Sequence, residues 1–343
     1  MMRISLLFIG IFLVVFSFAC PTNADEEKKF AIILAYFHVG NDLDPEFSIS
    51  QNLFDQHIKH LEEGAYNIVS LKDFTQGNLT TSDTAKKNVV LTFENVTEET
   101  LDVITPILDK KGIPYSLFIT PDNFISEKSR KKLLRVLENK LVTIGFHTDE
   151  YKYFDNVETF ESSLNSAKSV LRDIMGGQPP EFFAYPYSLY KKSHMDIVQK
   201  HGFKAVFGQH SGAALAEDEV LPRFTMTENY ASLERFQRIL SVSPLVTSDE
   251  EPKETVLDKG PVIVGFTLED ISEPNSLSCF LSGKGRIPYE VVSGKRIEIR
   301  PLIDPEHVRY RLNCILHDGE EGEILKWRGF LFEVLGDSAE PIQ

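Results

Sequence analysis

The stretch Val89-Val-Leu-Thr-Phe93, followed at once by Glu94-Asn95-Val96, sets the architecture of this chain. An unbroken apolar and β-branched run is typical of a strand buried on both faces, and the carboxylate and amide that follow mark its end. Apolar residues at helical spacing over 101–108 predict a helix that ends at Gly112-Ile113-Pro114. Another apolar run, Tyr115 to Ile119, follows it. Strand, helix and strand in this order form a unit of parallel sheet.

The same alternation extends in both directions along the chain. Further strands are predicted at Phe30 to Tyr36, Asn67 to Leu71, Val142 to Phe146, Phe182 to Tyr185 and Ala205 to Phe207. Helical stripes lie between them, with their apolar residues at Phe54, Ile58 and Leu61; Leu133, Val136 and Leu137; Phe160 to Ile174; and Met195 to His201. Residues 25–240 are therefore predicted to form an α/β domain, a parallel sheet or barrel with helices outside.

The pattern changes after residue 240. Residues 241–259 are rich in Ser, Pro, Asp and Glu without a period, and we predict a linker there. Over 260–336 we predict a small all-β sandwich. Residues 308–316 alternate apolar and polar side chains, as in an antiparallel sheet with one polar face. Cys314 falls on the apolar face and suits a disulfide with Cys279; two buried thiols are the alternative.

Composition limits the partners of this protein. The chain has 343 residues and a formal net charge of −15. Hydrophobic residues at 42% and charged residues at 25% are ordinary for a globular protein, so global disorder is excluded. The negative charge argues against nucleic acid or anionic lipid headgroups as the main partner.

The N-terminus carries the one long apolar run. Arg3 precedes Leu6 to Phe18, which has the length of a signal-peptide core and is short for a spanning helix. We predict a signal peptide over 1–24 and export to a bacterial periplasm or cell envelope. Cleavage before Asp25, lipid attachment at Cys20 and a retained anchor are the alternatives. A lipid at Cys20 is the membrane contact that we would then expect.

Polar side chains with catalytic chemistry follow several predicted strands. In a parallel α/β barrel the carboxyl ends of the strands meet at one face, where sites form. The residues at these positions are His38, Glu94, Asn95, His147, Thr148, Asp149, Tyr187, Gln209 and His210. Ordinary hydrogen-bonded loop residues are the alternative interpretation of each.

Several segments together resemble the polysaccharide deacetylases, the NodB-homology or carbohydrate esterase family 4 group. Residues 91–96 with 105–118 resemble the first motif region, Ile144-Gly145-Phe146-His147-Thr148 the second, and Phe183 to Ser188 the third. Residues 201–209, Leu221-Pro222-Arg223-Phe224 and the Tyr36 to His38 element also match, so the resemblance spans about 32–240. It implies a distorted (β/α) barrel of NodB type.

The resemblance also implies metal-assisted hydrolysis of the acetamide of an N-acetylhexosamine polysaccharide. In that mechanism a metal polarises the carbonyl and its bound water, and a carboxylate takes the proton. Glu94 stands at the position of the catalytic base. Substrate binding is expected at Tyr187, His38 and Gln209.

This sequence departs from the family pattern at the metal. The first motif is normally T-F-D-D-G and the second H-[ST]-x-x-H. Here Asn95 replaces the ligand Asp, Tyr151 replaces the second His, Val96 replaces the Gly, and His147 is kept. Losing a carboxylate and an imidazole costs roughly 5–8 kcal/mol of metal binding, about ten-thousand-fold or more in affinity. We therefore expect no cofactor, unless nearby carboxylates at Asp149, Glu150 or Asp155 rescue a Zn²⁺ site.

Three functions remain open at this point. The first is an exported deacetylase homologue that binds an N-acetylated envelope glycan with weak or no hydrolysis. The second is a working N-deacetylase with a rearranged metal site. The third is a metal-free glycosidase that uses Glu94 with Asp149 or Glu150 as a carboxylate pair.

Overall fold

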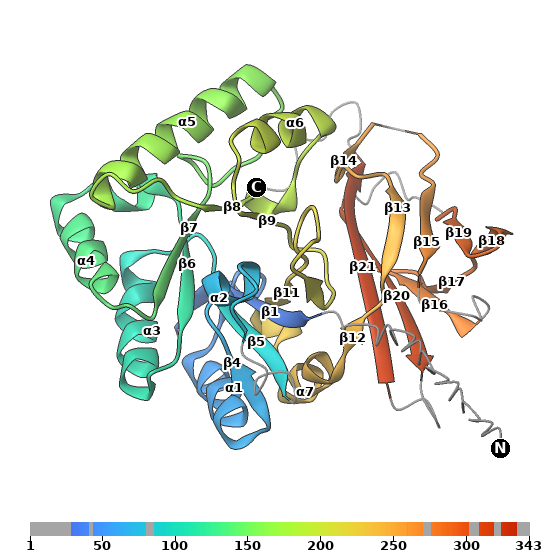
Figure 1. The fold of residues 1–343 in the computed structure, drawn as a ribbon, viewed down its shortest axis with the longest axis horizontal. Coiled ribbons are helices and arrows are strands. Elements are labelled where there is room, and N and C mark those ends of the chain that lie inside the picture. Colours follow the sequence, from blue (N-terminus) through green and yellow to red (C-terminus); the bar gives the residue numbers. More distant parts are fainter. Residues whose placement is uncertain are drawn as a thin grey trace, which may run out of the picture.

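The computed structural model describes residues 29–40, 44–79, 86–258, 260–269, 276–301, 309–318 and 324–334. The chain forms a helix-covered barrel beside an all-β unit (Figure 1). The predicted signal peptide and Cys20 lie outside the described residues. Among the residues that are described, no helix has the length and apolar character needed to cross a bilayer.

One curled sheet forms the barrel, and its central strands are parallel. The order is β10-β1-β5-β6-β7-β8-β9, with β11 also beside β1 and β4 beside β5. Leu221 bridges to Phe207 on β9, and the chain then enters β11 beside β1, so this segment spans the seam. The strands are β1 (Phe30–Tyr36), β4 (Tyr66–Ile68), β5 (Lys87–Phe93), β6 (Tyr115–Ile119), β7 (Val142–Phe146), β8 (Phe182–Ala184), β9 (Ala205–Phe207), β10 (Ala214–Leu215) and β11 (Phe224–Met226).

Helices cover the outside of this sheet (Figure 1). They are α1 (Gln51–Glu63), α2 (Leu71–Thr75), α3 (Glu98–Lys111), α4 (Glu127–Leu137), α5 (Val157–Ile174), α6 (Lys192–Lys200) and α7 (Leu233–Ser241). The helix α3 shows why these boundaries hold: the Thr97 hydroxyl accepts from the Thr100 N–H, and Gly112 ends it at φ 66°. Its buried Leu101, Ile104 and Leu108 join the barrel core. Two short strands, β2 (His38–Val39) and β3 (Ser48–Ile49), pair before α1.

Two sheets form the C-terminal unit and share one core. The first has the order β12-β21-β20-β16-β17 with β14 beside β21, and the second has β13-β15-β19-β18. Phe266 on β15 stacks on Phe330 of β21 at 5.3 Å between ring centroids, so the sheets face each other. The strands are β12 (Ser243–Pro244), β13 (Thr247–Glu251), β14 (Val256–Leu257), β15 (Val264–Leu268), β16 (Ser278–Leu281), β17 (Gly285–Ile287), β18 (Glu290–Ser293), β19 (Arg296–Ile299), β20 (Arg309–Asp318) and β21 (Ile324–Val334). The predicted barrel and small all-β sandwich are thus both present.

The predicted disulfide is present too. Cys279 and Cys314 lie opposite each other on the antiparallel strands β16 and β20, with 4.1 Å between Cα atoms. Both are fully buried in the sandwich core.

The segment predicted as a linker, 241–259, differs from that prediction. It begins with the last residue of α7 and contributes β12, β13 and β14 to the two sheets. These strands are two to five residues long, and β13 carries three acidic side chains, Asp249, Glu250 and Glu251, so no apolar period marks them. Glu250 on β13, for example, receives two hydrogen bonds from Arg328 on β21, at 2.7 Å each.

Candidate functional site

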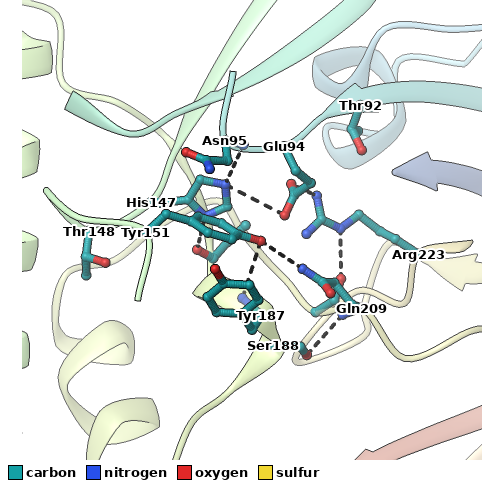
Figure 2. A network of polar contacts seen from close by, with 12 residues as sticks. Thr92, Glu94, Asn95, His147, Thr148, Tyr151, Tyr187, Ser188, Gln209 and Arg223 are labelled. Atoms are coloured by element: carbon teal, nitrogen blue, oxygen red, sulfur yellow. Dashed lines mark hydrogen bonds and ion pairs between the residues drawn. The ribbon is translucent and has the colours of Figure 1, made fainter. Parts of the chain in front are cut away.

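The carboxyl ends of the barrel strands bring most of the predicted site residues together. Glu94 and Asn95 follow β5, His147 follows β7, Tyr187 follows β8 and Gln209 follows β9. Figure 2 shows their side chains converging in one polar network. The parallel pairing of β5 to β9 places these strand ends at one face, as the sequence pattern predicted.

Glu94 is fully buried and is held by an arginine. Its Oε1 lies 2.5 Å from Nη1 of Arg223, which is also fully buried. Arg223 donates from Nε to the Gly208 carbonyl at 2.8 Å, and its guanidinium lies 4.9 Å from the Phe118 ring centroid. The ion pair fixes one carboxylate oxygen, while Oε2 has no hydrogen-bond partner among the described residues.

Arg223 is the site residue that the sequence interpretation missed. It stands within Leu221-Pro222-Arg223-Phe224, which contributed only to the family resemblance. It lies 129 residues from Glu94 in sequence, and the barrel seam joins the two.

His147 is a buried, neutral imidazole. Its Nδ1 lies 2.8 Å from the Ala184 carbonyl oxygen, which only accepts, so Nδ1 carries the proton. The free Nε2 lies 3.7 Å from Glu94 Oε2 and 3.5 Å from the Asn95 backbone nitrogen. Burial lowers the pKa of His147, and the nearby Glu94 carboxylate opposes that shift only in part. Two proton acceptors therefore face each other here.

Asn95 has a left-handed backbone conformation, and its side chain forms a hydrogen bond within the protein. Its φ is 45°, a left-handed conformation that Asn tolerates better than most residues. Its Oδ1 accepts from Asn123 Nδ2 at 2.8 Å. The left-handed residue is therefore Asn95, while Val96, at the family glycine position, packs in the core.

Tyr151 covers His147 at the position of the expected second imidazole. The two rings are 4.7 Å apart and nearly perpendicular. The Tyr151 hydroxyl accepts from Gln209 Nε2 at 3.1 Å and lies 3.4 Å from the Tyr187 backbone nitrogen. Burial raises the pKa of Tyr151 well above its ordinary value, so its hydroxyl stays protonated.

Tyr187 and its neighbours form an aromatic rim over this cluster. Tyr187 and Ser188 have consecutive positive φ angles of 53° and 60°. The half-buried Tyr187 ring lies 4.5 Å from Tyr151 and 6.3 Å from Phe47, and Phe37 lies 6.4 Å from Tyr151. Ser188 Oγ accepts from the Gln209 backbone N–H at 3.0 Å. Aromatic faces of this kind suit the apolar faces of sugar rings.

His38 lies apart from this network. Its Nδ1 contacts the hydroxyl of Thr100 on α3 at 3.3 Å, and its half-buried ring belongs to the short strand β2. The structure therefore gathers Tyr187 and Gln209 around Glu94, whereas His38 faces the start of α3.

The carboxylates considered for rescue of a metal site are engaged elsewhere. Asp149 accepts from the Ser163 hydroxyl on α5. Glu150 pairs with Lys152 at 2.7 Å, and Asp155 pairs with Lys191 at 2.8 Å. With these partners, neither Asp149 nor Glu150 forms a carboxylate pair with Glu94 in the structure.

The side chains present do not fit a tightly held divalent metal. The Asn95 oxygen is taken by Asn123, one Glu94 oxygen by Arg223, and a protonated phenol stands beside His147. Within the described ranges, no group of three or more His, Cys, Asp or Glu side chains is placed to hold an ion. Carboxylates and neutral imidazoles are the ligands that Zn²⁺ needs, and only part of that set is available here.

Comparison with known proteins agrees with the barrel geometry. Residues 81–206 match the family model described as polysaccharide deacetylase. A poly-beta-1,6-N-acetyl-D-glucosamine N-deacetylase of Staphylococcus aureus (strain MSSA476) is 22% identical over 216 residues, covering 57% of this chain and 73% of the relative.

Solved structures share the fold of the barrel. A de-N-acetylase from Aggregatibacter actinomycetemcomitans superposes with a TM-score of 0.55 at 17% identity, covering 62% of this chain and 100% of the other. The Streptococcus pyogenes deacetylase PplD gives 0.53 at 20% identity, with 62% and 99% covered. IcaB from Ammonifex degensii gives 0.52 at 19% identity, with 62% and 96% covered.

Proposed function

The barrel of this chain, through residues 81–206, belongs to the polysaccharide deacetylase family, and from it we propose an exported protein that binds an N-acetylated cell-envelope glycan without classical metal-dependent deacetylation. The ligand in this proposal is a polymer containing N-acetylhexosamine. The relative from Staphylococcus aureus, named for action on poly-beta-1,6-N-acetyl-D-glucosamine, supports that class of glycan.

One observation carries the proposal: the phenol of Tyr151 packs on His147 where a second imidazole is required. Together with the neighbouring side chains it leaves Glu94 and His147 with 0% of their surfaces exposed. A water that attacks a carbonyl must contact its general base and its activating group at hydrogen-bond distance. Neither group is accessible in this arrangement, so binding without hydrolysis is the function that the geometry supports best.

The glycan contact in this proposal is the aromatic rim formed by Phe37, Phe47, Tyr151 and Tyr187. These rings adjoin one another across the strand ends. Tyr187 is half-buried, and its ring lies against Tyr151 (Figure 2). An N-acetylated sugar that stacks on this rim would lie above His147 rather than beside it.

Acetate release and metal content test the absence of hydrolysis. The purified full-length protein is incubated with N-acetylglucosamine oligomers, with and without added Zn²⁺, and bound metal is measured. We expect no acetate above the buffer level and no stoichiometric zinc. Acetate release together with zinc that disappears in His147→Ala would overturn the proposal in favour of a rearranged metal site.

Retention on chitin or peptidoglycan tests the binding half of the proposal. Tyr187→Ala should weaken retention several-fold because it removes the ring at the rim. Tyr289→Ala, in the sandwich, is the matched loss of a tyrosine and should leave retention unchanged. Equal retention of both variants would count against the barrel rim as the glycan contact.

A further inference from the structure

The polar face of β20 turns toward the barrel, and one of its arginines, Arg311, makes no ion pair with a described residue. Arg309 on this face pairs with Glu333 at 2.6 Å and donates to the Tyr187 carbonyl at 2.7 Å. Asn313 accepts from the Ser211 hydroxyl at 2.5 Å. Between them Arg311 makes no side-chain hydrogen bond or ion pair with any residue that the structure describes.

A nearby arginine at the same interface is paired with carboxylates. Arg328 on β21 receives both oxygens of Glu250 at 2.7 Å and lies 3.5 Å from Asp218. A guanidinium removed from water without an anion is costly, which is why such groups are usually paired. Arg311 has no such pair among the described residues at the same interface, and the Glu333 carboxylate only partly offsets its charge.

A cavity of about 180 Å³ lies next to Arg311, between the barrel and the sandwich. Three arginines line it, Arg223, Arg235 and Arg311, and its lining contains no Asp or Glu. That composition is unusual in a chain with 51 acidic residues against 36 basic ones. Arg223 pairs with Glu94, whereas Arg235 and Arg311 form no ion pair with a described residue, so the cavity concentrates positive charge.

Two of the three guanidinium groups at this cavity share one aromatic ring. Arg235 and Arg311 lie 5.7 and 5.8 Å from the ring centroid of Tyr230. Arg235 donates only to backbone carbonyls, those of Tyr230 and Thr225. Burial, reinforced by Arg309 and Arg235, lowers the pKa of Arg311 to about 10. An anion between the two groups would relieve this repulsion.

A second and independent observation points to a missing acceptor. Arg223 is fully buried and lines the cavity, and its Nη2 has no hydrogen-bond partner among the described residues. Buried donors of this kind are nearly always satisfied in folded proteins. Arg223 also holds Glu94, so a ligand at this cavity would adjoin the candidate site through one shared side chain.

We propose that this cavity, lined by Arg223, Arg235 and Arg311, binds an oxyanion, such as a carboxylate or phosphate group, at the junction of barrel and sandwich. The planar fork of a guanidinium matches both groups with paired hydrogen bonds. A cavity of this size holds a group about as large as benzene, because a void of about 150 Å³ binds benzene. Trp327 also lines the cavity. The inference does not depend on whether the barrel hydrolyses its glycan.

Calorimetric titration of the full-length protein at constant ionic strength tests this site. Sodium glucuronate and inorganic phosphate are titrated separately, and neutral glucose serves as the uncharged control. We expect saturable binding of at least one anion and none of glucose. Tighter binding of glucuronate identifies a sugar-borne carboxylate as the source, and tighter binding of phosphate identifies free phosphate.

Arginine variants then locate the binding site. Arg311→Gln should weaken anion binding at least ten-fold, and Arg235→Gln provides a second test if the first variant does not fold. Arg286→Gln, on an exposed position of β17, makes the same charge change away from the cavity and should bind like the wild type. Absence of binding by either anion, or wild-type binding in folded Arg311→Gln and Arg235→Gln, overturns the proposal.

Discussion

The phenol of Tyr151 is the side chain on which the proposed loss of metal binding rests. It occupies the position of an imidazole, keeps its proton, and accepts hydrogen bonds from Gln209 while its ring lies against His147. Asn95 completes the change, because its amide oxygen is neutral and already bound to Asn123. In the proposed function, Asn95 and Tyr151 thus stand where the family pattern expects a negative charge and a second nitrogen for a divalent cation.

Restoring those two groups should create a zinc site. In Asn95→Asp/Tyr151→His, a carboxylate and an imidazole would join His147, and Asp tolerates the left-handed backbone at residue 95. We expect stoichiometric zinc by metal analysis and an affinity gain on the order of ten-thousand-fold. Asn95→Asp/Tyr153→His adds the same groups with the imidazole misplaced and should gain little. Equal zinc content in the two double variants would contradict this account of Tyr151.

Glu94 should act mainly as the counter-charge of Arg223. Glu94→Gln leaves a fully buried guanidinium without an anion, which costs about 3–5 kcal/mol in the free energy of unfolding. Denaturant unfolding measures this change. Glu234→Gln removes the carboxylate from an exposed pair with Arg238 and should have no measurable effect. A stability of Glu94→Gln equal to that of the wild type would mean that the buried pair contributes nothing.

The disulfide between β16 and β20 stabilises the sandwich through the unfolded chain. It closes a sequence separation of 35 residues, and a loop of that length is worth about 3–4 kcal/mol on the chain-entropy model. Cys279→Ala/Cys314→Ala should lower the free energy of unfolding by about this amount. The wild type treated with reductant should lose a similar amount, whereas the variant should not respond to reductant. A reductant effect on the variant would mean that another process is being measured.

Strands and helices were predictable where burial imposes a clear period. Tyr115–Ile119 and Val142–Phe146 match their predicted bounds because turn signals enclose each apolar run. The strands β12 and β13 could not be predicted, since short strands that carry Glu and Pro resemble a linker. The partners of these strands on β21, the paired strand for β12 and Arg328 for Glu250 of β13, lie more than seventy residues later in the chain.

The candidate site was predictable only in part. Glu94, Asn95 and His147 follow the strand ends as the motif spacing predicted, and Tyr151 lies beside His147 in the same network. It gave no sign of the Arg223 pair, because that contact depends on how the barrel seam closes. Spacing also could not predict that the Asn95 side-chain oxygen accepts a hydrogen bond from Asn123, because the geometry of the loop determines this contact.

The barrel and sandwich act on the site as one assembly. Arg309 on β20 donates to the Tyr187 carbonyl, and the Thr255 hydroxyl donates to the Ser188 carbonyl at 2.6 Å. These contacts hold two consecutive left-handed residues that present the rim. The C-terminal unit is therefore part of the support for Tyr187, and the rim is expected to depend on its folding.

Buried histidines spread through the barrel should make the folded protein sensitive to acid. Burial is the main cause that lowers the pKa of His57 and His194 to about 4 and that of His210 to about 3. Below about pH 6.5 the unfolded chain binds protons at these positions and the folded chain does not, so stability falls as the pH falls. Each of these histidines should lower the free energy of unfolding by about 2 kcal/mol between pH 7.5 and 5.0.

Denaturant unfolding between pH 7.5 and 5.0 measures how the free energy of unfolding changes with pH. Asp218 opposes this change, because burial raises the pKa of its carboxyl and its contribution to stability is lost as the pH rises. His57 is fully buried, with Nε2 donating to the Ala231 carbonyl at 2.7 Å, and His57→Gln should flatten the slope by the share of one histidine. His317→Gln, on β20, is the matched change at a histidine outside this group. The interpretation fails if His57→Gln and His317→Gln keep the same pH dependence as the wild type.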